Sequence, residues 1–207
     1  MELIYKYFPD LSELQYSKLA SLGKIYNDWN LKINLISRKD IAKLYEHHVL
    51  FSLTISKIFS FNSGSSVLDA GTGGGFPGIP LSIVFPDTNF LLVDSIGKKI
   101  FVVNDIIQQL ELKNVKAQQE RIEKLGSKFD FIISRALSSF PEFLKLTQNL
   151  IISDPKGKHQ KGYFYIKGGD INEEIKFFKN KVQVYELKNY FEEEFFNTKK
   201  IIYMPVN

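Results

Sequence analysis

The sequence predicts an α/β fold with a mostly parallel, seven-stranded sheet and an N-terminal helical extension. From residue 63 onward, short apolar runs alternate with segments of helical spacing, a pattern typical of α/β units. One of these runs leads directly into a glycine-rich loop and a helix, as at the ligand crevice of an open α/β sheet. The first 60 residues, in contrast, carry apolar side chains at helical intervals.

Residues 1–60 form the predicted helical extension, and residues 61–207 form the predicted core domain. Ser37 and Asp40 have the spacing of a helix cap, so a second helix is expected to start there. Residues 30–36 alternate polar and apolar side chains and are expected to connect the two helices. The apolar positions that predict the helices are Leu11, Leu14, Leu22, Ile25, Tyr26 and Trp29, then Ile41, Leu44, Tyr45, His48 and Leu53.

The core domain is expected to alternate strands with helices. The apolar runs that predict strands are 67–70, 90–94, 115–118, 129–134, 163–167, 183–187 and 200–204. The segments with helical spacing between them are 78–84, 98–110, 142–151 and 172–179.

Composition excludes several classes of chemistry. The 207 residues contain no cysteine, which excludes disulfides, thiolate nucleophiles and cysteine-ligated zinc, and we predict no metal site. No apolar run approaches the roughly 18 residues of a membrane-spanning helix, and we expect a cytoplasmic protein. The formal charge is +4, yet only Arg38, Arg121 and Arg135 among 27 basic residues are Arg. Each is a candidate for a bidentate or stacking contact that Lys makes poorly.

Five glycines lie among residues 71–78, directly after the predicted strand 67–70. Glycine is needed where the backbone adopts a positive φ or where a ligand lies against the main chain. A plain turn needs one or two, so Gly71, Gly73 and Gly75 are predicted to bind a ligand. The loop lacks the Lys of a Walker motif, and Phe76 stands where a dinucleotide-binding motif has a glycine. Both phosphate-binding interpretations are therefore weakened.

Two acidic residues at strand ends favour S-adenosylmethionine, which carries a cationic sulfonium and an aminocarboxylate but no phosphate. Asp69 lies at the end of the strand before the glycines and is predicted to engage the ammonium group, directly or through water. Asp94 ends the next strand 25 residues later, where a carboxylate reaches ribose hydroxyls in doubly wound folds.

Two further strand ends are predicted to complete the same rim. Arg121, Ile122 and Glu123 follow the third strand, where a backbone amide and an apolar side chain would frame an adenine. Arg135 follows the fourth strand, where a substrate base would approach the methyl group. The alternative for Arg121 and Glu123 is a solvated pair of charges at a helix start.

Several motifs of this chain together resemble a known family. They are Asp-Ala-Gly-Thr-Gly-Gly-Gly-Phe-Pro-Gly-Ile-Pro-Leu at 69–81, Asp-Ser-Ile-Gly-Lys-Lys at 94–99, Arg-Ile-Glu at 121–123, Ser-Arg-Ala at 134–136 and Tyr-Ile-Lys-Gly at 165–168, with Asn34-Leu35 and His48-Val49-Leu50 before them. Over nearly its whole length the chain resembles the bacterial small-subunit (16S) ribosomal RNA guanine-N7 methyltransferases, the RsmG family, formerly GidB.

The resemblance implies a class I S-adenosylmethionine-dependent methyltransferase with a Rossmann-like fold. The family methylates ring nitrogen 7 of one guanine in the decoding-region loop of 16S rRNA, so the expected partner is that RNA or the small ribosomal subunit. The family's cofactor positions fall on Gly71, Phe76, Ile122, Glu123 and Arg135. The positions implied for the catalytic pocket or the substrate are Arg135, Asn34, His48, Arg121 and Lys167.

This chain departs from the family at two places. Phe51 stands where the family usually has an Asp, which removes a hydrogen bond to the N-terminal helices. Lys199 and Lys200 stand near the last strand where the family tends to carry Arg, so a bidentate contact is not expected there.

Guanine nitrogen 7 has an in-plane lone pair and no proton, so its methylation needs no general base. We therefore expect catalysis by alignment and a methyl-transfer step that is flat from about pH 6 to pH 9. If the reaction uses a general base, His48 is the candidate. The alternative is that His48 is a structural histidine of the core.

Lysines after strand ends are predicted to contact RNA phosphates, namely Lys98, Lys99, Lys167 and Lys199, with Lys156, Lys158, His159 and Lys161 in the loop 154–162 as further candidates. The alternative for that loop is a solvated turn. We expect a monomer.

Two other classes of function stay open on the residues alone. An NAD-dependent oxidoreductase would explain the strand, glycine loop and Asp94, although Phe76 opposes it. A non-catalytic RNA-binding module would explain the basic charge but not five loop glycines with two strand-end acids.

Overall fold

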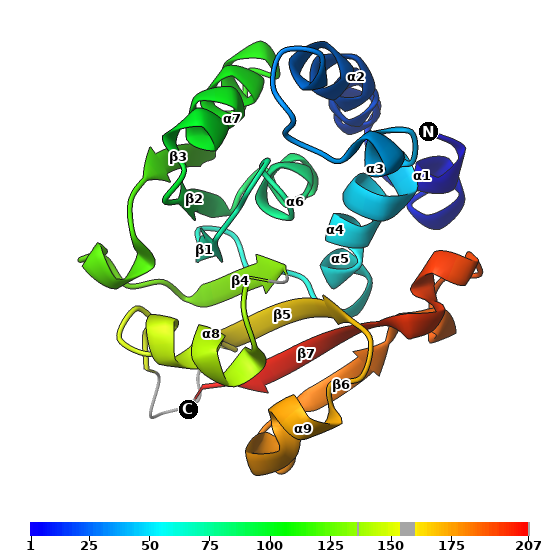
Figure 1. Cartoon of the computed structure of the whole chain (residues 1–207). Coiled ribbons are helices and arrows are strands. Elements are labelled where there is room, and N and C mark those ends of the chain that lie inside the picture. The colour runs from blue at the N-terminus through cyan, green and yellow to red at the C-terminus, as the bar shows by residue number, and fades with distance from the viewer. Residues whose placement is uncertain (136, 154–159, 207) are drawn as a thin grey trace.

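A twisted sheet forms the centre of the molecule. In the computed structural model, which describes residues 1–135, 137–153 and 160–206, seven strands are ordered β3-β2-β1-β4-β5-β7-β6 (Figure 1). Strands β1 to β5 run parallel, and β7 pairs antiparallel with both β5 and β6. The bounds are β1 Ser66–Ala70, β2 Asn89–Asp94, β3 Val115–Gln119, β4 Phe131–Arg135, β5 Gly162–Gly168, β6 Gln183–Glu186 and β7 Lys199–Pro205. The predicted sheet is confirmed.

Helices cover both faces of this sheet. The N-terminal segment contains α1 Glu2–Tyr7, α2 Glu13–Asn30, α3 Arg38–Ile41, the π-helical η1 Tyr45–Leu50, α4 Phe51–Leu53 and α5 Ile55–Ile58. The later helices are α6 Gly78–Val84, α7 Gly97–Gln109, α8 Phe140–Thr147 and α9 Asn172–Ile175. Short 3-10 turns are η2 Ile122–Lys124, η3 Lys176–Phe178, η4 Leu187–Asn189 and η5 Glu194–Thr198.

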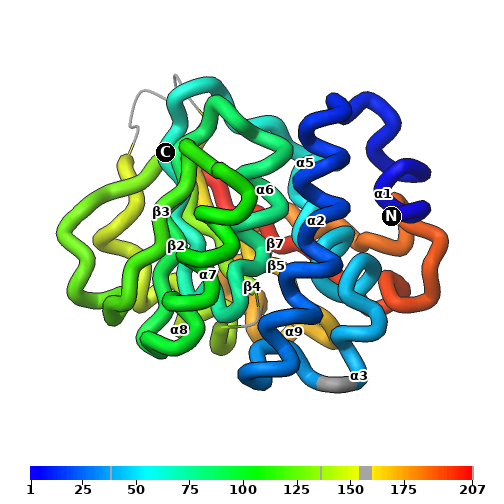
Figure 2. The backbone as a smooth tube through the Cα atoms, turned by 90° about the horizontal axis from the view of Figure 1, so that it is seen from above, coloured from blue at the N-terminus to red at the C-terminus, as the bar shows by residue number. Residues whose placement is uncertain are grey.

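The alternation of side chains along the strands divides the core in two. On β1, Val67 belongs to the cluster beneath the N-terminal helices, α6 and α7, whereas Leu68 belongs to the cluster beneath α8 and α9. Figure 2 shows α2 lying beside α6, along the same side of the molecule as α7. Each face of the sheet is therefore buried, as parallel sheets require.

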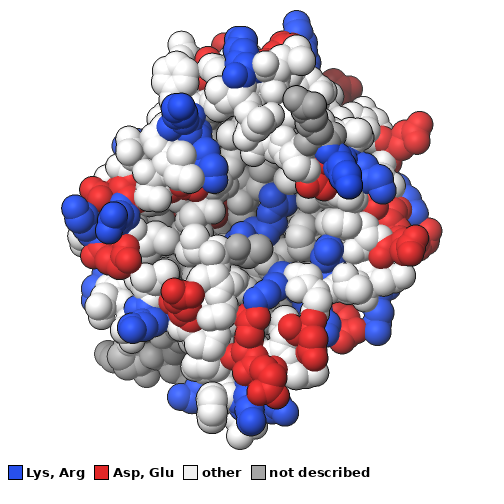
Figure 3. All heavy atoms as spheres, in the orientation of Figure 1, with Lys and Arg blue, Asp and Glu red and all other residues white. Residues whose placement is uncertain are grey.

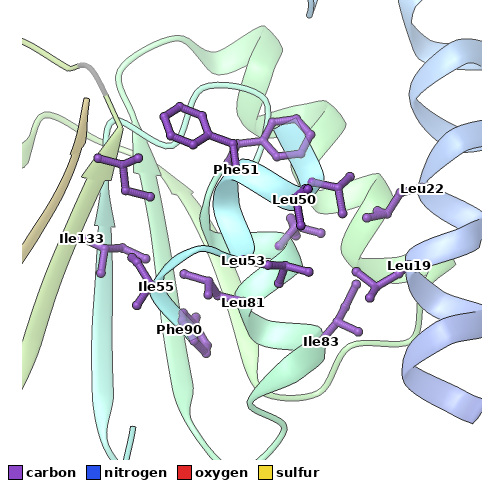
Figure 4. Packing of buried hydrophobic residues seen from close by; sticks show 14 of the residues in the cluster. Leu19, Leu22, Leu50, Phe51, Leu53, Ile55, Leu81, Ile83, Phe90 and Ile133 are labelled. Carbon is purple, nitrogen blue, oxygen red and sulfur yellow. The ribbon is translucent and has the colours of Figure 1, made fainter. Parts of the chain in front are cut away.

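The N-terminal segment packs into the same cluster as one sheet face. Figure 4 shows Leu19 and Leu22 of α2 directed toward Leu50 and Leu53, which in turn lie near Leu81 of α6. The side chains of these five residues are fully buried. Burying a Leu side chain contributes about 1.5–3 kcal/mol, so this layer is a substantial part of the stability.

Helices α2 and α3 each begin directly after a serine that caps them. Ser12 and Gln15 form a capping box at the start of α2, and Ser37 accepts a hydrogen bond from the Asp40 amide at the start of α3. Three details of the sequence-based helices were wrong. Leu11 lies before the start of α2, and the segment 41–53 is divided between α3, η1 and α4.

The third correction concerns the predicted helix 142–151. It begins earlier, after the cap Ser139, and ends at Thr147. The backbone of Leu150 and Ile152 bonds instead to Phe129, so this stretch lies beside the strand β4 region. Backbone groups that pair with a neighbouring chain are not available to continue a helix.

Candidate active site

Asp69, in β1, links the glycine loop to the start of α6 through hydrogen bonds. One carboxylate oxygen, Oδ2, accepts hydrogen bonds from Thr72 Oγ1 at 2.6 Å and from the Gly78 amide at 2.8 Å. A Cβ on Gly78 would lie 2.8 Å from that oxygen and 2.7 Å from Leu92, so only glycine allows this approach. Gly71 has φ +72°, a conformation that favours glycine.

The second oxygen of Asp69, Oδ1, is buried and has no hydrogen-bond partner among the described residues. Burial raises the pKa of Asp69 to about 7, although the bonds from Thr72 and Gly78 oppose the shift. A buried acceptor without a partner costs about 1–3 kcal/mol, and a bound donor or cation would recover that energy. This oxygen therefore fits the predicted partner of an ammonium group.

Asp94 joins the glycine loop to the end of β2. Its Oδ2 accepts from the Gly73 amide and its Oδ1 from the Ile96 amide, each at 2.9 Å. Lys99 Nζ lies 3.9 Å from Oδ2. Each carboxylate oxygen has two lone pairs, so Asp94 keeps acceptor capacity for the hydroxyls of a ligand.

A cavity of about 600 Å³ opens where β1, β2 and β3 end. This is the position at which open α/β sheets bind ligands. Its lining residues are Gly71, Val93, Asp94, Ser95, Gln119, Glu120, Arg121, Ile122, Glu123, Lys124, Leu137 and Leu146. The predicted residues Gly71, Asp94, Arg121, Ile122 and Glu123 are thus brought together, with Asp94 and Ile122 buried and Arg121 and Glu123 exposed.

Gln119 and Leu137 line this cavity and were not predicted from the sequence. Gln119 ends β3 and would have been found by the same strand-end argument that selected Asp94. Leu137 packs against Gly71, where a Cβ would lie 2.4 Å from Leu137 Cδ1. An isolated apolar residue after a strand carries no sequence signal for a site.

Arg135, at the end of β4, belongs to a second cluster built by the N-terminal helices. Its guanidinium donates to the His47 carbonyl at 3.2 Å and lies 2.9 Å from His48 Nδ1. The guanidinium carbon is 5.2 Å from the centroid of the Phe76 ring and 5.7 Å from that of Phe51. Burial lowers the pKa of Arg135 to about 10, so the group stays charged at neutral pH.

His48 is neutral in this cluster. Because Arg135 can only donate, His48 Nδ1 must be the acceptor, and the ring proton lies on Nε2. Burial and the neighbouring Arg135 charge lower the pKa of His48 to about 3. Nε2 is buried and has no partner among the described residues. His48 therefore does not titrate near neutral pH.

Phe76 forms the wall between the N-terminal helices and the end of β4. It is 4% exposed and stacks on Tyr26, with ring centroids 4.8 Å apart, and its ring lies 5.0 Å from that of His48. Tyr26 Oη donates to the Gly74 carbonyl at 2.6 Å. The helical extension therefore holds the glycine loop in place. Gly75 lies beneath Tyr26, with a positive φ of +95°.

The remaining predicted residues lie outside the 600 Å³ cavity. Asn34 is exposed and lines a separate hollow, and Lys98 lines another. Lys167 is ion-paired with Glu174, and Lys199 Nζ lies 4.5 Å from the Phe195 ring centroid. Figure 3 shows a hollow near the middle of this face with Lys and Arg side chains in and around it. Lys156, Lys158, His159 and the Arg38 side chain lie outside the described residues.

Neither a membrane-spanning helix nor a metal-binding cluster is found among the described residues. None of the helices described here combines the length and the apolar character that crossing a membrane requires. Nowhere in the described part of the chain do three or more His, Asp or Glu side chains converge as a metal site would require.

The strand order and the cavity define a class I methyltransferase fold. Among solved structures, the chain is similar to a SAM-dependent methyltransferase from Aquifex aeolicus, with a TM-score of 0.57 and 18% identity over 83% of this chain and 100% of that one. A precorrin-6y C5,15-methyltransferase from Geobacter metallireducens gives a TM-score of 0.54 and 14% identity over 84% and 92% of the two chains. The predicted fold class is thereby confirmed.

The family follows from the sequence matches. Residues 15–202 match the model of the rRNA small subunit methyltransferase G family, GidB, and the chain belongs to this family. Proteins named ribosomal RNA small subunit methyltransferase G are 50% identical in Flavobacterium johnsoniae, over 100% of this chain and 98% of that protein, and 48% identical in Bacteroides fragilis, over 100% of both. The resemblance predicted from the motifs is confirmed, and neither the oxidoreductase nor the non-catalytic module is supported.

The cofactor of this family and fold is S-adenosylmethionine, as predicted. The site fits it, since Asp94 lines the cavity and offers acceptors for hydroxyls, and the buried Asp69, which ties the glycine loop to α6, has an Oδ1 without a partner among the described residues. The cavity also lies within the roughly 300–1,000 Å³ typical of small-molecule sites.

Proposed function

We propose that the protein transfers the methyl group of S-adenosylmethionine to ring nitrogen 7 of a guanine in the decoding-region loop of 16S rRNA. The observation that carries the proposal is the pairing of a strand-end cofactor crevice with a charged Arg135 cluster beside it, in a chain of the methyltransferase G family. The proposed substrate is RNA carrying this base, free or within the small ribosomal subunit, and the proposed enzyme is a cytoplasmic monomer.

The cofactor supplies an electrophilic methyl group when it is bound. Asp94 would bind the ribose hydroxyls, and Gly71, Ile122 and Glu123 would surround the adenine, since all four line the cavity. Asp69 Oδ1 would hold the ammonium group, directly or through water, which would give the buried oxygen the partner it lacks. These residues bind and orient, and none of them has to exchange a proton with the substrate.

Arg135 positions the substrate base. Its guanidinium is fixed by His47 and His48 and lies against the rings of Phe76 and Phe51. Guanine presents two acceptors, N7 and O6, on one edge, and Arg is the usual partner of that edge. Since N7 must stay free to accept the methyl group, Arg135 is suited to hold O6.

The reaction needs no general base, and the histidine that bonds to Arg135 does not supply one. His48 is neutral above about pH 3 and bonds to Arg135 through the nitrogen that would otherwise accept a proton. Rate acceleration then comes from alignment of nitrogen, methyl carbon and sulfur. Positive charge moves from the sulfur to the base during the transfer. Nearby carboxylates and aromatic ring faces stabilise this charge in the transition state.

Lys98, Lys99, Lys167 and Lys199 are proposed to contact phosphates and to position the RNA. Lys98 is exposed and free for this role, whereas Lys167 would have to exchange its Glu174 partner for a phosphate. The contacts would be independent of sequence, so Arg135 carries the recognition of the base.

The test is a methyl-transfer assay with labelled S-adenosylmethionine on small ribosomal subunits from a strain that lacks this modification. Mass spectrometry of the digested RNA is expected to find 7-methylguanine at one position. Transfer to a different atom or a different RNA would contradict the substrate, and the absence of transfer by a protein that still binds the cofactor would contradict the proposed reaction.

A further inference from the structure

An aromatic hollow lies beside the cofactor crevice, and its aromatic rings have no role in the function proposed above. It measures about 460 Å³ and is lined by Trp29, Ile33, Gly97, Lys98 and Phe101. These residues come from the end of α2 and the start of α7, and α7 begins three residues after Asp94. Phe101 is 66% exposed, although an exposed Phe ring contributes nothing to the core.

The Trp29 ring is held in a fixed orientation. Its Nε1 donates to Asp105 Oδ2 at 2.7 Å, and its ring meets Phe101 edge to face, with centroids 5.8 Å apart at 86°. Lys32 Nζ lies 4.7 Å from the centroid of the same ring. A ring fixed in this way loses little entropy when a planar group stacks beside it.

The charges around the hollow select an anionic ligand. Lys98 lines it and Lys32 lies against the Trp29 ring, and both are exposed, while Lys99 at the next position of α7 lies 3.9 Å from Asp94 Oδ2. The nearest acid on α7, Asp105, is bonded to Trp29 and Gln109, while Asp28 is exposed beside Trp29 in the sequence. Aromatic rings combined with lysines are the features by which proteins bind single-stranded nucleic acid.

We propose that this hollow binds an unpaired base of the RNA strand that carries the target guanine, stacked against Phe101 and Trp29, with Lys98 and Lys32 at its phosphates. The inference rests on the proposed function, because it assigns a second contact to the same substrate. A neighbouring hollow shares Ile33 and is also lined by Lys32 and Asn34. Amide groups bind the edges of bases, so Asn34 would act on the same strand.

The first test measures KM for unmethylated small ribosomal subunits with substitutions at the exposed ring. Phe101→Ala is expected to raise KM about tenfold, since stacking on one aromatic residue commonly contributes that much. Phe101→Tyr keeps the ring and is expected to recover most of the affinity. Phe177→Ala is the matched control, because Phe177 is 85% exposed on η3, outside the described hollows at the cofactor edge. The affinity for S-adenosylmethionine is expected to be the same in all four proteins.

The second test uses Trp29, the only tryptophan of the chain, as a probe. An RNA oligonucleotide with the sequence of the decoding-region loop is expected to quench its fluorescence, with weaker binding by Phe101→Ala. Lys98→Ala is expected to reduce the slope of log Kd against log salt by about 0.7, whereas Phe101→Ala leaves the slope unchanged. Lys145→Ala, an exposed lysine of α8, serves as the control.

The outcomes separate this inference from the proposed function. An unchanged KM for Phe101→Ala overturns the stacking site while methyl transfer by the wild type stands. If KM rises but the RNA does not quench Trp29 fluorescence, the hollow contacts a ribosomal protein instead of RNA. This result also overturns the stacking site. If the wild type transfers no methyl group, the proposed function fails, and the quenching experiment alone decides whether RNA stacks at Trp29.

Discussion

The cofactor crevice and the Arg135 cluster are two neighbouring regions built in different ways. The crevice consists of strand ends and of loop backbone tied by Asp69 and Asp94. The Arg135 cluster consists of side chains from distant parts of the chain, since His48 of η1 and Phe76 of the loop meet Arg135 of β4. The first region depends on topology, whereas the second depends on how the helical extension packs.

This difference indicates how the two regions respond to change. Crevice residues are held by the sheet, so substitutions there alter the ligand contact directly. Arg135 is held by His47 and His48, and its geometry therefore depends on the N-terminal layer. Variants that affect one region and not the other test whether cofactor binding and base positioning are separable.

The largest effect is expected from Arg135→Ala. Removal of the positioning guanidinium should lower the methyl-transfer rate about a hundredfold, because misplacement of a reacting group commonly costs that much. The affinity for S-adenosylmethionine should fall much less than the rate, since Arg135 does not line the cavity and acts on Asp69 only through its charge. Single-turnover rates and calorimetric titration measure the two quantities.

Arg135→Lys is the matched variant and is expected to recover little, because an ammonium cannot hold two partners in the planar geometry of a guanidinium. If cofactor affinity falls as far as the rate in Arg135→Ala, Arg135 belongs to the crevice and the division is wrong.

The next effect concerns the crevice itself. Gly71→Val should weaken S-adenosylmethionine binding about thirtyfold, because a β-branched residue at positive φ is strained by about 1–3 kcal/mol and the loop relieves this strain by leaving the conformation that lines the cavity. Its Cβ would also displace Leu137 into the cavity. Gly126→Val is the control, since a Cβ there meets no atom within 4 Å. Equal affinities for the two variants, measured by titration, would contradict the assignment of the cavity.

An intermediate effect is expected from pH. With a pKa near 7, Asp69 is mostly protonated at pH 6 and mostly ionised at pH 8. Only the ionised form attracts an ammonium group, so cofactor affinity should fall about tenfold as pH decreases from 8 to 6. The rate at saturating cofactor should stay flat over the same range. Titration at several pH values measures the affinity.

Asp69→Asn is the control for this titration, because an amide keeps an acceptor for Thr72 and Gly78 but has no charge to lose. Its cofactor affinity should be weak and independent of pH. A wild-type affinity that does not change between pH 6 and pH 8 would show that Asp69 does not hold the ammonium group.

The smallest effect is expected from His48→Gln. The amide oxygen can accept from Arg135 as the neutral ring does, so the rate should fall by about threefold or less. His48→Leu leaves the Arg135 donor unpaired and should cost about 1–3 kcal/mol of positioning or stability. A pH–rate profile of wild type and His48→Gln checks both. A titration limb that disappears in His48→Gln would identify a base and contradict the account.

The sheet could be predicted in detail because its strands are short apolar runs bounded by turn residues. All seven strands lie within two residues of their predicted starts, and Asp94 and Ile122 were found from strand ends alone. The helix ends were less accurate, since the end of α8 is set by the pairing of residue 151 with Phe129.

The Arg135 cluster could not be assembled from the sequence. Arg135, His48 and Phe76 were each singled out, yet their mutual contacts depend on long-range packing that no local pattern encodes. The hollow at Trp29 was missed for a related reason, because Trp29 fits a buried helix face and Phe101 lies within an apolar helix pattern. Exposure of a ring is decided by what packs over it.

A crystal structure with S-adenosylhomocysteine tests the central claim most directly, because the account assigns each part of the ligand to a named contact. We predict ribose hydroxyls within hydrogen-bond distance of Asp94, adenine beside Ile122, and the amino group paired with Asp69 Oδ1, directly or through one water, while Arg135 keeps its contact with His48. A ligand bound outside the cavity at Gly71, or an Asp94 carboxylate without contact to it, would contradict the account.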